Sequence, residues 1–364
     1  MATNKNQHYV PQCYLRRFAV EKSRTAINLF NLDRMKFIKS APINHQCSKN
    51  YFYGEDLVLE KALQPIENKY APIITNISKK GYKLKNEHQF LLKKFWLLQY
   101  LRTEAASIRS VEMIEEMGEV IGEKAREFRL RLADAVQNAM SLFAEKNEII
   151  DDLKVCLLRN KTDLDFVTSD DPSVLTNKLF LIKRKGESFG LNSAGNLILL
   201  PLTPKILLIG YDKHVYSVPQ KDGWSTINNK TDIEALNQHQ FLNCRANIYV
   251  HNSSCSDYIA NYYEYVKQNR PKTRLKIHYA VLNKKDGSSK EYIVVDRKES
   301  DNNKEALIHY QTISAKPSKW PKQIRWRLNG FAYSNGTGAG LIRQKEAVTM
   351  PNKGFRKIKI RKQS

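Results

Sequence analysis

The spacing of apolar residues changes near Asp163, and this change constrains the fold more than any other feature of the chain. Before it, apolar residues recur every three to four positions in segments 55–79 and 87–109, as in amphipathic helices. After it, short apolar runs such as 197–200 and 206–211 alternate with turn residues, as strands do. We therefore predict an α+β protein, with a helical N-terminal half packed on a mixed β-sheet domain.

Individual elements follow from the same pattern. Pro65 and Pro72 should kink or divide the helical segment 55–79 into shorter helices. Further helices are expected over 110–146 and 148–158. The remaining expectations are a hairpin over 26–38, strands at 180–182, 197–200, 206–211 and 246–250, helices at 231–243 and 256–267, and a second hairpin over 274–295.

Three parts are predicted: a mainly helical part (1–160), an α/β sheet part (161–315) and a basic C-terminal segment (316–364). The last part is distinct in composition, because it holds 13 Lys or Arg and a single acidic residue, Glu346. Its basic residues alternate with aromatic ones, a pattern that can neutralise phosphates and stack bases. The candidate nucleic-acid contacts there are Lys319, Trp320, Lys322, Arg325, Trp326, Arg327, Arg356, Lys357, Lys359 and Arg361.

The charge of the whole chain points the same way. Its 60 Lys and Arg against 37 Asp and Glu give a formal net charge of +23. So large an excess favours a polyanionic partner, and nucleic acid, DNA or RNA, is the simplest one. A protein partner or a homo-oligomer is left open by the sequence.

Two other classes of protein are not indicated. The N-terminus has no apolar run of the signal-peptide type, and no segment has the apolar length of a membrane span. The five cysteines are scattered and contain no Cys-x-x-Cys pair, so we predict reduced thiols and a cytoplasmic location. His45 beside Cys47 is weak evidence for a metal, because no second pair of ligands is near.

The first candidate site is the stretch His8 to Phe18, HYVPQCYLRRF. Pro11 suits the first turn of a helix. His8 would then lie at the helix start, with Gln12 and Arg16 one turn apart on the same face. His8 could act as an acid or base near neutral pH, and Arg16 could hold phosphate. Equally, His8 could cap the helix while the arginines are solvated.

A second candidate pair is Gln99 and Arg102, three residues apart on an otherwise apolar helix. Buried amides and charges need partners. One interpretation is a structural hydrogen-bond network that fixes helix packing. The other is a shared cleft with His8, in which Arg102 clamps a phosphate or carboxylate and Gln99 orients reacting groups.

A third site is Thr168-Ser-Asp-Asp-Pro172, directly after a short strand. Acidic side chains at a strand end are where metal-dependent hydrolases often hold Mg²⁺ or Mn²⁺, so Asp170 and Asp171 are the candidate metal ligands. The alternative is an Asx turn before proline.

These motifs, together with Pro201-Leu-Thr-Pro204, resemble those of the bacterial domain of unknown function family 4238 (DUF4238) over about residues 5 to 255. The resemblance implies a set of co-occurring polar residues and carries no settled activity. From the residues themselves we predict a nucleic-acid-binding protein, with metal-dependent nuclease activity as a hypothesis and a role in defence against phage as its context. The candidate catalytic residues are His8, Gln12, Gln99, Arg102, Asp170 and Asp171. Two alternatives stay open: a non-enzymatic nucleic-acid-binding subunit, and a nucleotide-sensing protein.

Overall fold

The computed structural model describes residues 5–20, 24–121, 130–287, 289–296 and 305–360. A mixed sheet of five strands lies at its centre, in the order β11-β5-β9-β8-β7. Only β11 and β5 run parallel, and the other neighbours are antiparallel. The strands are β5 (Lys154–Asn160), β7 (Val174–Thr176), β8 (Leu197–Thr203), β9 (Ile206–Tyr211) and β11 (Trp224–Ile227).

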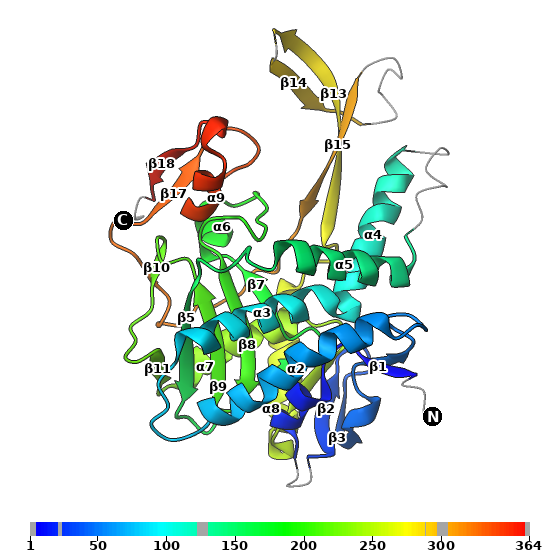
Figure 1. Ribbon diagram of the computed structural model, residues 1–364, viewed down its shortest axis with the longest axis vertical. Helices are drawn as coiled ribbons and strands as arrows, with labels where there is room; N and C mark the ends of the chain where they lie inside the picture. The colour runs from blue at the N-terminus through cyan, green and yellow to red at the C-terminus, as the bar shows by residue number, and fades with distance from the viewer. Residues whose placement is uncertain (1–4, 21–23, 122–129, 288, 297–304, 361–364) are drawn as a thin grey trace.

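One face of this sheet is covered by N-terminal helices (Figure 1). They are α2 (Val58–Ile77), α3 (Asn86–Arg102) and α5 (Leu132–Lys146), and α4 (Glu104–Ile121) follows α3 directly. Apolar side chains of α2, α3 and α5 form one cluster with Leu157, Leu200 and Leu208 of the sheet. Trp96 of α3 also donates its indole N–H to the Leu199 carbonyl at 3.0 Å. The expected α+β class, with helices concentrated in the N-terminal half, is confirmed.

The opposite face of the sheet packs on later segments. Leu158, Leu199 and Leu207 point to this side because successive strand residues alternate between faces. Their partners come from α6 (Lys178–Lys183), α7 (Lys230–Asn243) and the C-terminal segment. The sheet therefore lies between the N-terminal helices and elements from the second half of the chain.

A second sheet joins distant parts of the chain in the order β3-β2-β12-β6. It packs on α7 and on α8 (Ser256–Val266). Its strands are β2 (Ala26–Asn31), β3 (Lys36–Pro42), β6 (Thr168–Ser169) and β12 (Asn247–Val250). Both sheets thus combine strands from before and after residue 160.

The expected division of segment 55–79 is wrong, because α2 continues through Pro65 and Pro72. Both prolines are exposed and lie seven residues apart, two turns on the same outer side. Each proline leaves the carbonyl one turn earlier without its N–H partner. These two carbonyls belong to the exposed residues Lys61 and Asn68.

Within the described residues, no helix is both long and apolar enough to cross a membrane.

Two other predicted elements are wrong in type. Residues 154–158 of the expected helix 148–158 belong to β5, an inner strand with a continuous buried apolar run. Such a run fits a buried strand as well as a helix. Conversely, the expected strand 180–182 lies in helix α6, because the Asn177 side chain caps that helix by accepting from the Phe180 N–H at 3.2 Å.

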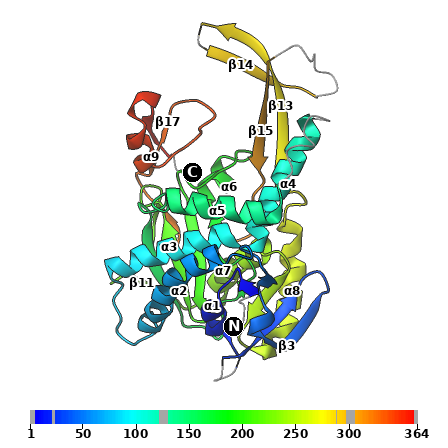
Figure 2. The same ribbon diagram turned by 45° about the vertical axis from the view of Figure 1, so that its right-hand side comes forward.

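A three-stranded sheet, β14-β13-β15, projects from the body beside α4 (Figures 1 and 2). Its strands are β13 (Leu275–Asp286), β14 (Ser289–Val294) and β15 (Ala306–Thr312). Their bases, near Leu275 and Thr312, adjoin the body. The remaining short elements are β1 (Asn6–His8), α1 (Gln12–Leu15), β4 (Ser48–Asn50) and β10 (Tyr216–Ser217).

The C-terminal segment is anchored to the body. Its elements are β16 (Arg325–Trp326), β17 (Phe331–Ser334), α9 (Gln344–Thr349) and β18 (Arg356–Lys359). Strand β16 pairs with β10, and Ile324 and Leu341 are buried in the core. The fully buried Arg343 donates from Nε to Asp152 at 2.9 Å. Residues 316–360 therefore contribute to the fold as well as to the charge.

A buried polar network and an adjoining pocket

Tyr14 joins three of the sequence motifs. Its buried hydroxyl donates to the Pro201 carbonyl at 2.7 Å and lies 2.6 Å from Oγ1 of Thr168. Burial raises the pKa of Tyr14 above its ordinary value, so the group stays a neutral hydroxyl. The motif beginning at His8, the motif at Thr168 and the Pro201 segment are thus held together by one side chain.

The remaining motif is Gln99-Tyr-Leu-Arg-Thr103, and its last residue, Thr103, joins it to the motif at Thr168. Its Oγ1 donates to Oδ1 of Asp171 at 2.7 Å and accepts from the Ala106 N–H at 3.2 Å. The second bond caps the start of α4, which explains why the expected helix 87–109 breaks after Arg102. The other Asp171 oxygen, Oδ2, pairs with Nη1 of Arg109 at 2.7 Å.

Asp170 is directed at the backbone. Its Oδ1 accepts from the N–H of Arg245 at 2.8 Å, and its Oδ2 accepts from Ala246 and Asn247 at 2.8 and 2.9 Å. Burial raises the pKa of Asp170 to about 6, although the three N–H donors act to lower it. This carboxyl group fixes the connection between α7 and β12 against β6.

These bonds bear on the expected role of the two aspartates as metal ligands. All four carboxylate oxygens already face hydrogen-bond donors, and a cation at Asp171 would have to displace the Arg109 guanidinium. Among the residues that the structure describes, no group of three or more His, Cys, Asp or Glu side chains is placed to hold a metal. A site for Mg²⁺ or Mn²⁺ stays a prediction, without support from the geometry of these carboxylates.

Arg102 is fully buried and its donors are used within the chain. Nη1 pairs with Oε1 of Glu67 at 2.8 Å. With the Gln99 carboxamide oriented so that its oxygen faces the guanidinium, that oxygen accepts from Nε and Nη2, each at 2.7 Å. Burial alone would lower the pKa of Arg102, but Tyr53 and Glu67 outweigh it and raise the pKa. The guanidinium is a structural cation that pairs with α2.

His8 borders the Arg102 group. Its ring is partly buried, and within the described chain its Nε2 is a buried nitrogen with no hydrogen-bond partner. Burial lowers the pKa of His8, while the Asn44 backbone and Glu67 act in the opposite direction. Gln12 accepts from Nη2 of Arg16 at 2.9 Å on the exposed surface, as the expected one-turn spacing allows.

Four of the six predicted catalytic residues lie in two groups, whereas Asp170 faces the backbone at 245–247 and Gln12 bonds to Arg16 at the surface. In the first group Arg102 bonds to Glu67 and Gln99, with His8 nearby, and in the second Asp171 is bonded to Thr103 and Arg109. The groups meet where Arg102 ends α3 and Thr103 precedes α4.

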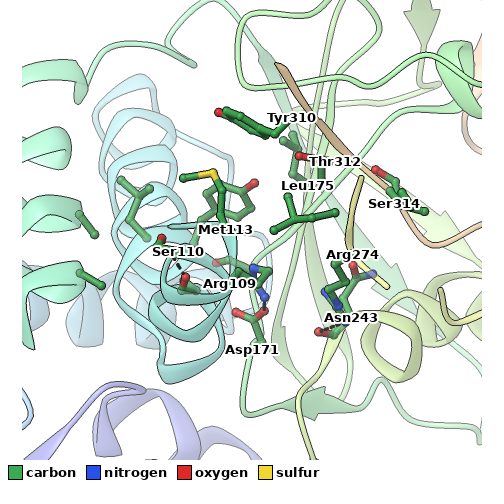
Figure 3. A pocket seen from close by; sticks show the side chains of 18 of the residues that line it. Arg109, Ser110, Met113, Asp171, Leu175, Asn243, Arg274, Tyr310, Thr312 and Ser314 are labelled. Atoms are coloured by element: carbon green, nitrogen blue, oxygen red, sulfur yellow. Dashed lines mark hydrogen bonds and ion pairs between the residues drawn. The ribbon is translucent and has the colours of Figure 1, made fainter. Parts of the chain in front are cut away.

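A cavity of about 490 Å³ adjoins the Asp171 group. Figure 3 shows Asp171, Arg109, Arg274 and Asn243 at one end of it, with Met113 and Tyr310 farther along. Its walls come from α4, α5, β7 and the bases of β13 and β15. Of the residues predicted from sequence, the cavity contains Asp171 alone among its described lining residues.

The polar residues of this cavity that sequence reasoning missed include Arg109, Ser173, Asn243 and Arg274. A threonine followed by an acidic residue at 103–104 is a helix-start signal and would have placed Arg109 in the second turn of a new helix. For Arg274 no comparable signal exists, because it lies 103 positions from Asp171 and is brought there by tertiary packing.

The predicted nucleic-acid contacts lie elsewhere. Lys319, Lys322, Arg325 and Arg327 are exposed, as are Arg356, Lys357 and Lys359 on β18; Arg361 lies outside the described residues. The two tryptophans are partly buried in contact with the body. Trp320 packs on His239 and Trp326 on Tyr216, with ring centroids 5.4 and 5.3 Å apart. Lys178 lies over both indoles, at 5.7 and 5.4 Å from the ring centroids.

Fold and site together define an α+β protein with a buried polar network that connects four sequence motifs. Residues 6–254 match the model of the family described as "Protein of unknown function (DUF4238)", and the chain belongs to that family. The match confirms the resemblance and its extent. Comparison with curated proteins and with solved structures finds no significant match.

Proposed function

We propose that this protein binds nucleic acid through the exposed basic side chains of its C-terminal segment, hereafter the basic face. One observation carries the proposal, namely that no acidic side chain in the described part of the chain pairs with these cations. Within the described residues none of them is in an ion pair with Asp or Glu, and Glu346, the single acidic residue there, lies beside the buried Arg343. The basic face consists of Lys316, Lys319, Lys322, Arg325, Arg327, Lys353, Arg356, Lys357 and Lys359.

Exposed cations without an acidic partner among the described residues suit a phosphate backbone, although Lys357 also lies over the Phe331 ring and Arg327 donates to the Lys213 carbonyl. Each lysine or arginine that contacts a phosphate releases condensed counterions, so affinity falls steeply with salt and depends little on sequence. The partly buried Trp320 and Trp326 already have ring or cation neighbours. Phosphate contact is therefore a better supported mode than base stacking on these two rings.

The proposal is for binding without catalysis, in the cytoplasm. The hydrogen bonds of Asp170, Asp171, Gln99 and Arg102 favour structural roles for four of the six candidate catalytic residues. A cytoplasmic location is supported by the five cysteines, all free thiols. Metal-dependent cleavage is a separate hypothesis, for which His8 is the candidate with an unpartnered ring nitrogen.

The test uses labelled DNA and RNA oligonucleotides with the full chain, titrated over a range of salt concentrations. Arg356→Gln, Lys357→Gln and Lys359→Gln together remove three cations of the basic face. If all three contact phosphate, the slope of log affinity against log salt should fall by about 2 to 3. The matched control is Arg34→Gln, Lys36→Gln and Lys39→Gln, which removes one arginine and two lysines from the exposed β2–β3 hairpin.

The control triple should leave the slope nearly unchanged. Equal losses in both triples would show a non-specific effect of net charge, and absence of binding by the unaltered chain would contradict the proposal. Adding Mg²⁺ or Mn²⁺ to the same samples tests cleavage. Product formation that His8→Ala abolishes would establish the nuclease hypothesis in place of simple binding.

A further inference from the structure

Arg274 is the most under-satisfied cation in the cavity described above. Its Nη2 makes two long hydrogen bonds, to the carbonyls of Leu242 at 3.3 Å and Asn243 at 3.2 Å. No carboxylate among the described residues is in an ion pair with it, since the nearby Asp171 pairs with Arg109. Its Nε and Nη1 have no hydrogen-bond partner in the described chain. A cation that is partly buried and poorly paired is costly unless an anion joins it.

Ser173 supplies a second, independent observation. It is 3 % exposed and lines the same cavity, and its hydroxyl oxygen has no hydrogen-bond partner within the part of the chain that the structure describes. Buried hydroxyls are normally satisfied. One end of the cavity is thus lined by two side chains with unused donors, Ser173 directly before β7 and Arg274 directly before β13, both beside the Asp171–Arg109 pair.

Aliphatic side chains form a large part of the remaining wall, which also contains aromatic residues such as Phe189 and polar residues such as Asn138 and Thr312. Met113 and Ile114 of α4, Leu142 of α5 and Leu175 of β7 line it, and flexible Met and Leu side chains adapt to unbranched chains. Figure 3 shows Met113 and Leu175 between the charged end and Tyr310. The volume, about 490 Å³, is within the range of small-molecule sites.

We propose that this cavity binds a small amphipathic anion, with a carboxylate or phosphate group held by Arg274 and Ser173 and an alkyl chain against the α4, α5 and β7 walls. The anion would accept from the unused guanidinium N–H groups and from the Ser173 hydroxyl. Arg109 would stay paired with Asp171, so that pair is neutral overall and Arg274 supplies the net positive charge at this end. This site is separate from the basic face, so it does not depend on nucleic-acid binding.

Calorimetric titration of the full chain with hexanoate, octanoate and decanoate below their micelle concentrations tests the proposal. Affinity should rise about fourfold per added methylene, because each buried CH₂ adds a similar increment. Decyl phosphate distinguishes a phosphate headgroup from a carboxylate. Decanol, which has no charge, should bind at least tenfold more weakly than decanoate.

The decisive variant is Arg274→Gln, expected to weaken decanoate binding about tenfold to a hundredfold by removing the charge-assisted hydrogen bonds. Arg274→Lys should recover part of the affinity. Lys272→Gln is the matched control, because it removes one positive charge two residues away on an exposed side chain outside the cavity lining. Melting temperatures of all three variants show whether loss of binding reflects loss of fold.

Several results would overturn the proposal. They are no binding of any alkyl anion, decanol binding as tightly as decanoate, or equal affinity in Arg274→Gln and the unaltered chain. AMP is included as a further ligand. Binding of AMP in preference to decanoate would overturn the alkyl assignment and identify a nucleotide pocket instead.

Discussion

Two arginines of this protein, Arg102 at the end of α3 and Arg274 directly before β13, have different surroundings. Arg102 is fully buried, and Glu67 and Gln99 accept from three of its nitrogens at 2.7 to 2.8 Å. Arg274 contacts two carbonyls at 3.2 and 3.3 Å and has an open cavity beside it. A buried cation that its own chain satisfies stabilises a fold, whereas one left partly unpaired is available to a ligand.

Membership of a sequence motif does not distinguish a structural arginine from a candidate ligand-binding one. Arg102 belongs to a recognisable motif, Gln99-Tyr-Leu-Arg102-Thr103, and Arg274 belongs to none. Both positions hold a single arginine. The two arginines differ in whether the neighbouring parts of the chain supply hydrogen-bond acceptors for the guanidinium.

The largest expected effect is on folding. Arg102→Met should destabilise the protein by about 3 to 5 kcal/mol, because it leaves Glu67 without its partner and the buried Gln99 amide with an unsatisfied oxygen. Arg274→Met, the same change at the cavity, should cost less than about 1 kcal/mol, since it removes a cation that is poorly paired. Urea denaturation followed by circular dichroism measures both. Equal losses would remove the distinction between the two arginines.

A pH dependence is expected from Asp170. Its pKa is raised from an ordinary value of 3.8 to about 6, so between these two pH values the folded state holds a proton that the unfolded state releases. The stability from this group is fully present below about pH 3.8 and is lost as the pH rises through 6, a difference of about 3 kcal/mol.

The measurement compares the unfolding free energies of the unaltered chain and of Asp170→Asn between pH 4 and 7. The variant should lack this part of the pH dependence, because asparagine does not titrate. If stability instead rises with pH in the unaltered chain alone, the effect of the three backbone N–H donors on the pKa of Asp170 outweighs that of burial. The carboxylate is then ionised throughout this pH range.

The smallest expected changes in stability come from removing two hydroxyl groups. Thr103→Val should cost about 1 to 2 kcal/mol, because Thr103 both caps α4 and donates to Asp171. Ser173→Ala should change stability by less than about 0.5 kcal/mol, because Oγ of Ser173 has no hydrogen-bond partner to lose among the residues that the structure describes. Thermal unfolding resolves the difference, and a large loss in Ser173→Ala would show that this hydroxyl is satisfied in solution.

Local sequence patterns were sufficient for much of the fold. The strands 197–200 and 206–211 lie within β8 and β9, and the helix 231–243 matches α7, because each has a clear period or a helix-start residue. Errors occurred where burial overrides local pattern. An apolar run at 155–158 is a strand only because β9 and β11 flank it, and Asn177 makes a helix of residues that favour a strand in isolation.

The α+β class, the family and the excess of positive charge follow from composition, periodicity and contiguous motifs, so they can be read from the chain alone. Which polar residues find hydrogen-bond partners depends instead on tertiary packing. Asp170 and Asp171 are neighbours in the chain, yet one accepts from backbone N–H groups at 245–247 and the other from Thr103 and Arg109. Hydrogen bonds act over about 3 Å. A partner 62 to 77 residues away is therefore set by how sheets and helices pack, which no local pattern encodes.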